Sequence, residues 1–420
     1  MINRQQAPDT PAFLPLQLPN VTKLRLCGKT PLTILHNANH PLLSIHITFY
    51  AGNWYATQAG IAYLTAKMLT KGTTSQSADM IAQAIEHYGG RISISHGNDL
   101  LYVTLSALDQ YITRLFPLLI ALLTESNFPV AAFDKLSKLI HEKINQHQAN
   151  PQTYASQKIR EAVFGDNHPY GAILDHEKLK KISAADLQTF FNDKCWQQAE
   201  VFLNGNVTPS IIAALDKAFS AVTPKPLTPT YHQLQPKKRQ IKLTRANSVQ
   251  SVIHMGHPTI TPTHPDYISL YITNQLLGGF FGSRLMRNIR EDKGYTYGIH
   301  SYIDTMQHHS FWGLYTAVHE DHTQATYAEI AKEINQLKEK PITQEELNIL
   351  KSYLTGELLG GFEDFSASVS RLENLYMHHL DLHYYHRLYE TIQHITPIEI
   401  QQIAQKYLGP ADLHQVTIGR

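Results

Sequence analysis

The chain has 420 residues, 43% of them hydrophobic, and a formal net charge of +1 from 36 Lys and Arg against 35 Asp and Glu. This composition is typical of a globular protein of two or three domains, and the near-zero charge argues against a general affinity for nucleic acid or an acidic membrane. The longest apolar run, residues 115–123, is too short to cross a bilayer, and two cysteines cannot form a disulfide framework.

The N-terminal segment, residues 1–19, contains four prolines and lacks the apolar region of a signal peptide. We therefore expect a cytoplasmic protein.

The first half continues with an expected strand at SIHITFYAG and a helix from Gly60 to about Leu69. The alternating apolar residues of LLYVTLSA predict a half-buried strand, and Leu136, Ile140 and Ile144 have the spacing of an amphipathic helix. A proline cluster at 224–236 is the best candidate for a linker, because proline removes backbone donors and favours extended chain.

The second half repeats these elements in the same order. SVIHMGH precedes an expected helix at 265–277, FWGLYTAV takes the place of LLYVTLSA, and VTIGR takes that of FLNGN. Ala51-Gly52 and Met255-Gly256 differ by 204 positions, and Gly205 and Gly419 differ by 214. Such steady offsets predict a tandem repeat of one domain.

The predicted fold class is therefore α+β, with two tandem homologous domains that each pack helices on a mostly antiparallel sheet. We place the first domain at residues 1–222, the Pro-rich linker at 223–238 and the second domain at 239–420.

Four segments carry a more specific signal. They are GIAYLTAKMLTKGT (60–73), HPYG (168–171), LLGGFFGSRLMRNIREDKGYTYG (276–298) and the closing VTIGR. Considered alone, the first segment is an amphipathic helix that ends at a glycine, with Ile61, Leu64, Met68 and Leu69 toward the core.

Together these segments resemble the pitrilysin/insulinase family of zinc metallopeptidases, and most closely its short bacterial and mitochondrial-processing-peptidase-like branch. The resemblance extends from about Leu24 to Arg420. It implies two homologous domains per chain and, in active members, an inverted zinc motif His-x-x-Glu-His on a first-domain helix.

At the motif positions this sequence has Tyr63 and Lys67 in place of the two histidines and Ala66 in place of the glutamate. Tyrosine and protonated lysine offer no comparable zinc site, and alanine cannot act as a general base. We therefore expect no metal and no cofactor in this chain.

The resemblance places the third zinc ligand, a glutamate, about 75 residues beyond the second histidine, which leads to Glu142. One interpretation is an ordinary exposed helix residue. The sharper hypothesis is that Lys67 and Glu142 form an ion pair where zinc would bind.

The second-domain signature is intact. The resemblance implies that Arg290 and Tyr297 hold the substrate backbone and stabilise the developing oxyanion, which makes them the candidate catalytic and substrate-binding residues. The alternative is an arginine in a surface salt bridge and a tyrosine at the start of a strand.

In some members of this family two chains divide these roles. The sequence thus favours a non-zinc-binding subunit of a heterodimeric endopeptidase that acts on unfolded peptides, with zinc in a homologous partner chain and no role for nucleic acid or membrane. An alternative is a catalytically silent scaffold derived from the peptidase fold.

A third possibility is a metal site among the 24 histidines. The candidate pairs are His36 with His40, His379 with His383, and His383 with His386. We expect His308 and His309 at the tip of a hairpin.

Overall fold

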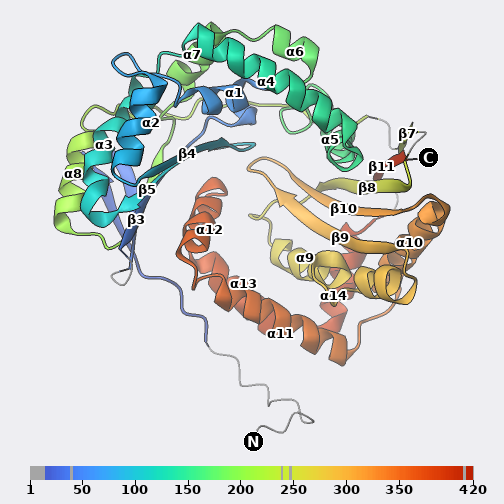
Figure 1. Ribbon diagram of the computed structural model, residues 1–420. Helices are drawn as coiled ribbons and strands as arrows, with labels where there is room; N and C mark the ends of the chain where they lie inside the picture. The colour runs from blue at the N-terminus through green and yellow to red at the C-terminus, as the bar shows by residue number, and fades with distance from the viewer. Residues whose placement is uncertain (1–14, 38–40, 238–239, 246–247, 410–412, 420) are drawn as a thin grey trace, which may run out of the picture.

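In a computed structural model the described residues are 15–37, 41–237, 240–245, 248–409 and 413–419. The chain forms two sheets with helices packed around each, which confirms the predicted α+β class (Figure 1).

The first sheet has six strands in the order β1-β2-β6-β3-β5-β4. Only β2 and β6 are parallel neighbours; the other pairs are antiparallel. The strands are β1 Val21–Leu26, β2 Thr30–His36, β3 Leu42–Phe49, β4 Arg91–His96, β5 Leu101–Leu108 and β6 Glu200–Gly205.

The first half contains eight α-helices within the described residues. They are α1 Ile61–Met68, α2 Ala78–His87, α3 Asp109–Thr124, α4 Val130–Ala149, α5 Pro151–Phe164, α6 His176–Lys180, α7 Ala184–Lys194 and α8 Pro209–Phe219.

The second sheet has the order β7-β11-β8-β10-β9, which repeats the order of the last five strands of the first sheet. Its one parallel pair, β7 with β11, corresponds to β2 with β6. The strands are β7 Gln240–Thr244, β8 Gln250–Thr259, β9 Thr296–Thr305, β10 Ser310–His319 and β11 His414–Gly419.

Most helices of the second half follow the β9–β10 hairpin in the chain. They are α9 Tyr267–Asn274, α10 Thr323–Glu339, α11 Gln344–Gly360, α12 Phe365–Met377, α13 His383–His394 and α14 Pro397–Tyr407. Two π-helical segments, 275–279 and Met286–Asp292, follow α9. The predicted helix at 265–277 is thus shorter as an α-helix, because its C-terminal turn widens into the first π-helical segment.

The predicted repeat is visible in the topology, and the two halves also exchange a helix. Helix α5 packs against β8 and β11 of the second sheet, whereas α12 packs against β6 of the first. The first residues of these helices, at 151 and 365, are 214 positions apart. Figure 1 shows α5 beside the second sheet and α12 between the halves.

Because of this helix exchange, each hydrophobic core contains residues of both halves. Val416 and Ile418 of the second sheet pack in one cluster with Ile159 of α5, and Phe202 of the first sheet packs in the other cluster with Leu372 of α12. The halves are therefore fastened by buried apolar surface, which is the main source of folding free energy.

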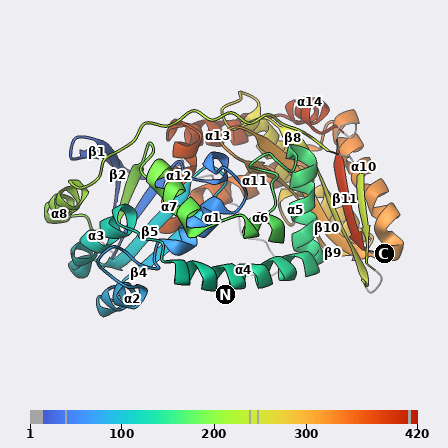
Figure 2. The ribbon, with the colours of Figure 1, turned by 90° about the horizontal axis from the view of Figure 1, so that it is seen from above.

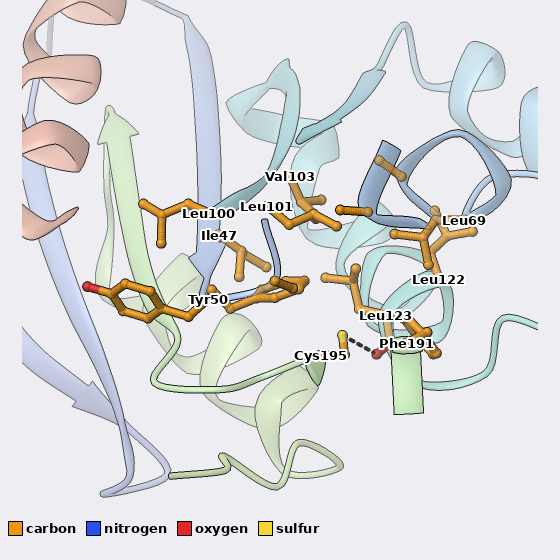
Figure 3. Packing of buried hydrophobic residues seen from close by; sticks show 14 of the residues in the cluster. Ile47, Tyr50, Leu69, Leu100, Leu101, Val103, Leu122, Leu123, Phe191 and Cys195 are labelled. Atoms are coloured by element: carbon orange, nitrogen blue, oxygen red, sulfur yellow. Dashed lines mark hydrogen bonds between the residues drawn. The ribbon is translucent and has the colours of Figure 1, made fainter. Parts of the chain in front are cut away.

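The centre of the first core surrounds β3 and β5 (Figure 3). Ile47 and Val103 lie against residues of α3 and α7, among them Leu122 and Phe191. The thiol of Cys195 is buried there and donates to the carbonyl of Leu123 at 3.5 Å, and burial raises its pKa far above the usual range. A thiol held neutral in this way is a packing residue.

Between α8 and β7 the described residues form no helix or strand apart from an isolated bridge, Gln197 with Lys225. This agrees with extended chain in the Pro-rich segment. The domain boundaries given above stay a prediction.

Candidate functional site

Helix α1 carries the altered motif positions. Its expected core side is buried, since Ile61, Leu64 and Met68 are each at most 3% exposed. Ala66 is also buried, whereas Tyr63 is half-buried and Lys67 is exposed.

The residue that meets α1 from α4 is Lys143, which the sequence analysis did not select. Its Nζ donates a hydrogen bond to the Tyr63 hydroxyl at 3.2 Å and lies 5.3 Å from the centroid of the Tyr63 ring. The Nζ of Lys67 lies 5.9 Å from the same centroid. Two ammonium groups thus share one aromatic ring, a favourable position for each cation.

The hypothesis of an ion pair between Lys67 and Glu142 is wrong. Both side chains are exposed, and among the described residues no salt bridge within 4.0 Å includes either of them. Successive residues of an α-helix point about 100° apart. Glu142 therefore faces a different direction from Lys143, and Lys143 takes the place expected for Glu142.

His96, at the end of β4, completes the group. Its ring packs on Tyr63 with centroids 5.2 Å apart. Burial, followed by the nearby charges of Lys67 and Lys143, lowers the pKa of His96 to about 4. The imidazole is therefore neutral at pH 7, in a locally positive field.

These residues do not fit a catalytic zinc ion. A zinc site needs three or four neutral imidazole, thiolate or carboxylate ligands. Among the described residues no group of three His, Cys, Asp or Glu could hold an ion, and the two lysine ammonium groups beside Tyr63 would repel a dication. Ala66 leaves no carboxylate at the position of the general base.

Two cavities flank this group. The inner cavity, about 400 Å³, is lined by Tyr63, His96, Lys143 and His147 together with residues of the loop before α1. The outer groove, about 1010 Å³, runs between β4 and α4 and is lined by Lys67, Lys71 and Lys135. Figure 2 shows α4 along this side of the molecule.

Arg290 lies in the π-helical segment Met286–Asp292. Its guanidinium carbon is 4.6 Å from the centroid of the Phe281 ring, and it forms no hydrogen bond or ion pair with any described residue. The neighbouring Arg284 differs, because it donates two hydrogen bonds of 3.0 Å to Glu346 on α11. Arg290 therefore does not form the surface salt bridge that was the alternative interpretation of this residue.

Tyr297 is the second residue of β9 and is 91% exposed. Neither it nor Arg290 lines the inner cavity or the outer groove. The opposite end of β9 leads into a hairpin tip that contacts the first domain through Gln307 and His308. At about 3.3 Å per residue, the strand places Tyr297 roughly 26 Å from that tip. Tyr297 is therefore presented to solvent, whereas Arg290 is half-buried.

The HPYG segment is part of the contact between the halves. Tyr170 donates to the buried carboxylate of Asp99, and Arg160 donates to the Tyr170 carbonyl at 3.0 Å while pairing with Asp304 of β9. His168 packs against Trp54, on which His308 stacks at 4.0 Å between centroids. His308 and His309 lie at a hairpin tip, as expected.

The histidine pairs do not build a metal site in the part of the chain that the structure describes, where no group of three His, Cys, Asp or Glu could hold an ion. His379 instead contacts Gln307 at 3.0 Å. His40 lies outside the described residues. Nor does any described helix combine the length and apolar character needed to span a bilayer.

Sequence reasoning missed Lys143, His96 and Phe281. Lys143 follows the residue that the spacing indicated, and Phe281 lies inside the signature segment. Nothing in the sequence around His96 distinguishes it from the other histidines.

Comparison with known proteins now decides the family. The model for the insulinase family, peptidase family M16, matches residues 32–176, and the model for the peptidase M16 inactive domain matches residues 181–354. The chain belongs to the M16 peptidase family.

Some similar proteins are named as zinc proteases and another as a non-peptidase homolog. A Helicobacter pylori protein named non-peptidase homolog YmxG is 25% identical over 413 residues, which is 96% of this chain and 94% of that protein. A Bacillus subtilis protein named uncharacterized zinc protease YmxG is 24% identical over 316 residues, or 74% and 76% of the two chains.

Solved structures share the fold. A peptidase M16 inactive domain structure from Pseudomonas fluorescens has a TM-score of 0.87 at 22% identity, covering 95% of this chain and 98% of that one. A protease structure from Helicobacter pylori has a TM-score of 0.88 at 16% identity, covering 96% and 100%. These two structures show that the chain has the fold of M16 peptidases along nearly its whole length.

Proposed function

We propose that this chain is the non-zinc-binding subunit of a heterodimeric zinc endopeptidase. A homologous chain with an intact His-x-x-Glu-His motif supplies the zinc, its ligands and the general base. This chain supplies Arg290 and Tyr297 and half of a chamber that admits unfolded peptides.

The free guanidinium of Arg290 is the single observation that carries the proposal. An arginine without an acidic partner, held against an aromatic ring and close in sequence to an exposed tyrosine, can donate to an acceptor from another molecule. Because the pair lines neither cavity beside α1, it is better placed to serve a second chain than its own first domain.

The proposed chemistry needs donors and no acid or base from this chain. Arg290 and Tyr297 would donate hydrogen bonds to the carbonyl oxygen of the scissile peptide bond. These bonds strengthen as negative charge develops on that oxygen, which lowers the barrier to hydrolysis.

The second candidate is a catalytically silent scaffold, and the relative named a non-peptidase homolog favours it. In that case the partner complex forms without any dependence of activity on Arg290.

The test mixes the full chain with a homologous zinc-motif chain from the same genome and follows cleavage of an unfolded peptide. We expect activity only in the mixture. Arg290→Ala should lower kcat/KM by about a hundredfold, as expected for the loss of one oxyanion donor. Size-exclusion chromatography should show that the complex survives.

The matched control is Arg287→Ala, because Arg287 is an exposed arginine of the same segment. It should leave the rate within about twofold. Full activity of the Arg290→Ala mixture would favour the scaffold.

A further inference from the structure

The two cavities beside α1 share one electrostatic character. We use the name α1 cleft for the inner cavity and the outer groove together. Tyr63 lines the first and Lys67 the second, and the Lys67 Nζ lies 5.9 Å from the centroid of the Tyr63 ring. Lys143 lines the inner cavity, while Lys67, Lys71 and Lys135 line the outer groove. No aspartate or glutamate of the described chain lines either of them.

These lysines are not neutralised by any residue that the structure describes. Lys67, Lys71 and Lys135 form no ion pair with any described residue. Lys143 makes one hydrogen bond, to the uncharged Tyr63 hydroxyl, and an ammonium has three donors. In a chain whose net charge is +1, four uncompensated cations around one cleft are a local concentration of charge.

The positive charge of the lysines also affects the pKa values of the neighbouring histidines. The pKa of His147, like that of His96, is lowered first by burial and then by the charge of Lys143. Both rings are therefore neutral donors or acceptors at pH 7, and neither can provide a negative charge.

The lining also has an apolar component. Ile92 and Ile94 of β4 and Leu136 and Leu139 of α4 line the outer groove together with the lysines. A small inorganic anion would contact the ammonium groups alone, whereas an extended peptide can place apolar side chains on the isoleucines and leucines and a carboxylate on the lysines.

We infer that the α1 cleft binds acidic peptides, with a peptide carboxylate against Lys67 and Lys143 at the position where active relatives of the family hold zinc. The choice of a peptide as the ligand rests on the proposed function. The charge class of that peptide rests on the cleft itself.

The test is isothermal titration calorimetry of the full chain with unlabelled decapeptides. Three C-terminally amidated peptides share one sequence and differ at three positions, which are Glu, Gln or Lys. A fourth peptide is the Gln version with a free C-terminal carboxylate, which separates recognition of a side-chain carboxylate from that of the terminus.

We expect the Glu peptide to bind at least about tenfold more tightly than the amidated Gln peptide, since a hydrogen bond to a charged group is lost with each carboxylate. The Lys peptide should bind most weakly. Tighter binding of the free-acid Gln peptide than of its amide would support the same site through the terminal carboxylate.

Lys67→Gln/Lys143→Gln should abolish this preference without altering the fold, because both side chains are exposed. Lys138→Gln is the matched control, since Lys138 is exposed on α4 and lines neither cavity. Equal binding of the Glu and amidated Gln peptides, an unaffected double variant, or no binding of the Glu peptide would overturn the proposal.

The two proposals fail separately. Loss of the carboxylate preference with Arg290-dependent cleavage retained would leave the subunit assignment standing. The reverse result would leave the acidic-peptide site standing.

Discussion

At the scale of single residues, only part of the α1 site could be identified from the sequence. The residue on α4 depended on its spacing from Lys67, which no local pattern fixes. The motif frame identified Tyr63, Ala66 and Lys67 because they lie within one helix. The step from Lys67 to α4 crosses two strands and two helices, so an error of one position in the loops turns the chosen side chain by about 100°. That error is the difference between Glu142 and Lys143.

Arg290 and Tyr297 could be selected because seven residues of intact signature connect them. The high exposure of Tyr297 and the half-buried position of Arg290 could not be predicted, since they depend on which elements cover the segment. Their roles stay a proposal.

Gly171, in the HPYG segment, provides a prediction at this scale. A Cβ there would lie 2.3 Å from the carbonyl oxygen of Gly165 and 3.0 Å from that of Arg160, so backbone would have to move. Gly171→Ala should lower the free energy of unfolding by about 2–3 kcal/mol in urea titrations.

The control is Gly356→Ala on α11. No heavy atom lies within 4 Å of a Cβ at Gly356, and alanine is the better helix former. This change should raise the free energy of unfolding by about 0.5–1 kcal/mol. Equal effects of the two substitutions would contradict the packing described for the HPYG turn.

At the scale of elements, periodicity and internal offsets were enough to predict the repeat. The strands at LLYVTLSA and FWGLYTAV became β5 and β10, equivalent positions in the two sheets. The exchange of α5 and α12 was not predicted, because a buried helix face has the same period whichever sheet it covers.

The β9–β10 hairpin tip gives a prediction for an element. The buried Asp99 carboxylate accepts a hydrogen bond from the Gln307 amide at 3.0 Å and another from Tyr170. Asp99→Ala should therefore cost about 1–3 kcal/mol of stability and speed hydrogen exchange at the Gln307 amide.

Asp134→Ala serves as the control, because Asp134 is exposed on α4. Its effect should stay within about 0.5 kcal/mol. Slow exchange at Gln307 in the Asp99 variant would show that the tip is held by other contacts.

At the scale of the whole molecule, buried histidines set the dependence of stability on pH. Burial, helped at several sites by neighbouring basic groups, lowers five histidine pKa values from 6.5 to about 4. The residues are His96, His168, His254, His308 and His378.

Because these pKa values are lower in the folded state, the unfolded chain takes up more protons below pH 6.5. Their contribution to stability is complete above that pH and is lost as the pH falls from 6.5 toward 4. Asp99 and Glu200 act in the opposite direction, since burial raises both pKa values, that of Asp99 to about 6, but they are two groups against five. We expect the free energy of unfolding to fall by at least about 2 kcal/mol between pH 7 and pH 5.

His254→Phe should make that slope shallower. The buried His254 ring stacks on Tyr315, and neither of its nitrogens has a hydrogen-bond partner among the described residues. Phenylalanine keeps the stacking and removes the titrating group. Stability that is unchanged or higher at pH 5 would contradict this account of the histidines.

We propose that the first-domain site is cationic and holds no zinc. The direct measurement is the zinc content of the full, tag-free chain after equilibrium dialysis, with Tyr63→His/Ala66→Glu/Lys67→His/Lys143→Glu as the positive control. We predict less than about 0.1 zinc per wild-type chain and about one per chain in the four-residue variant, which restores two imidazoles and a carboxylate as ligands. A wild-type chain that retains about one zinc would contradict the claim.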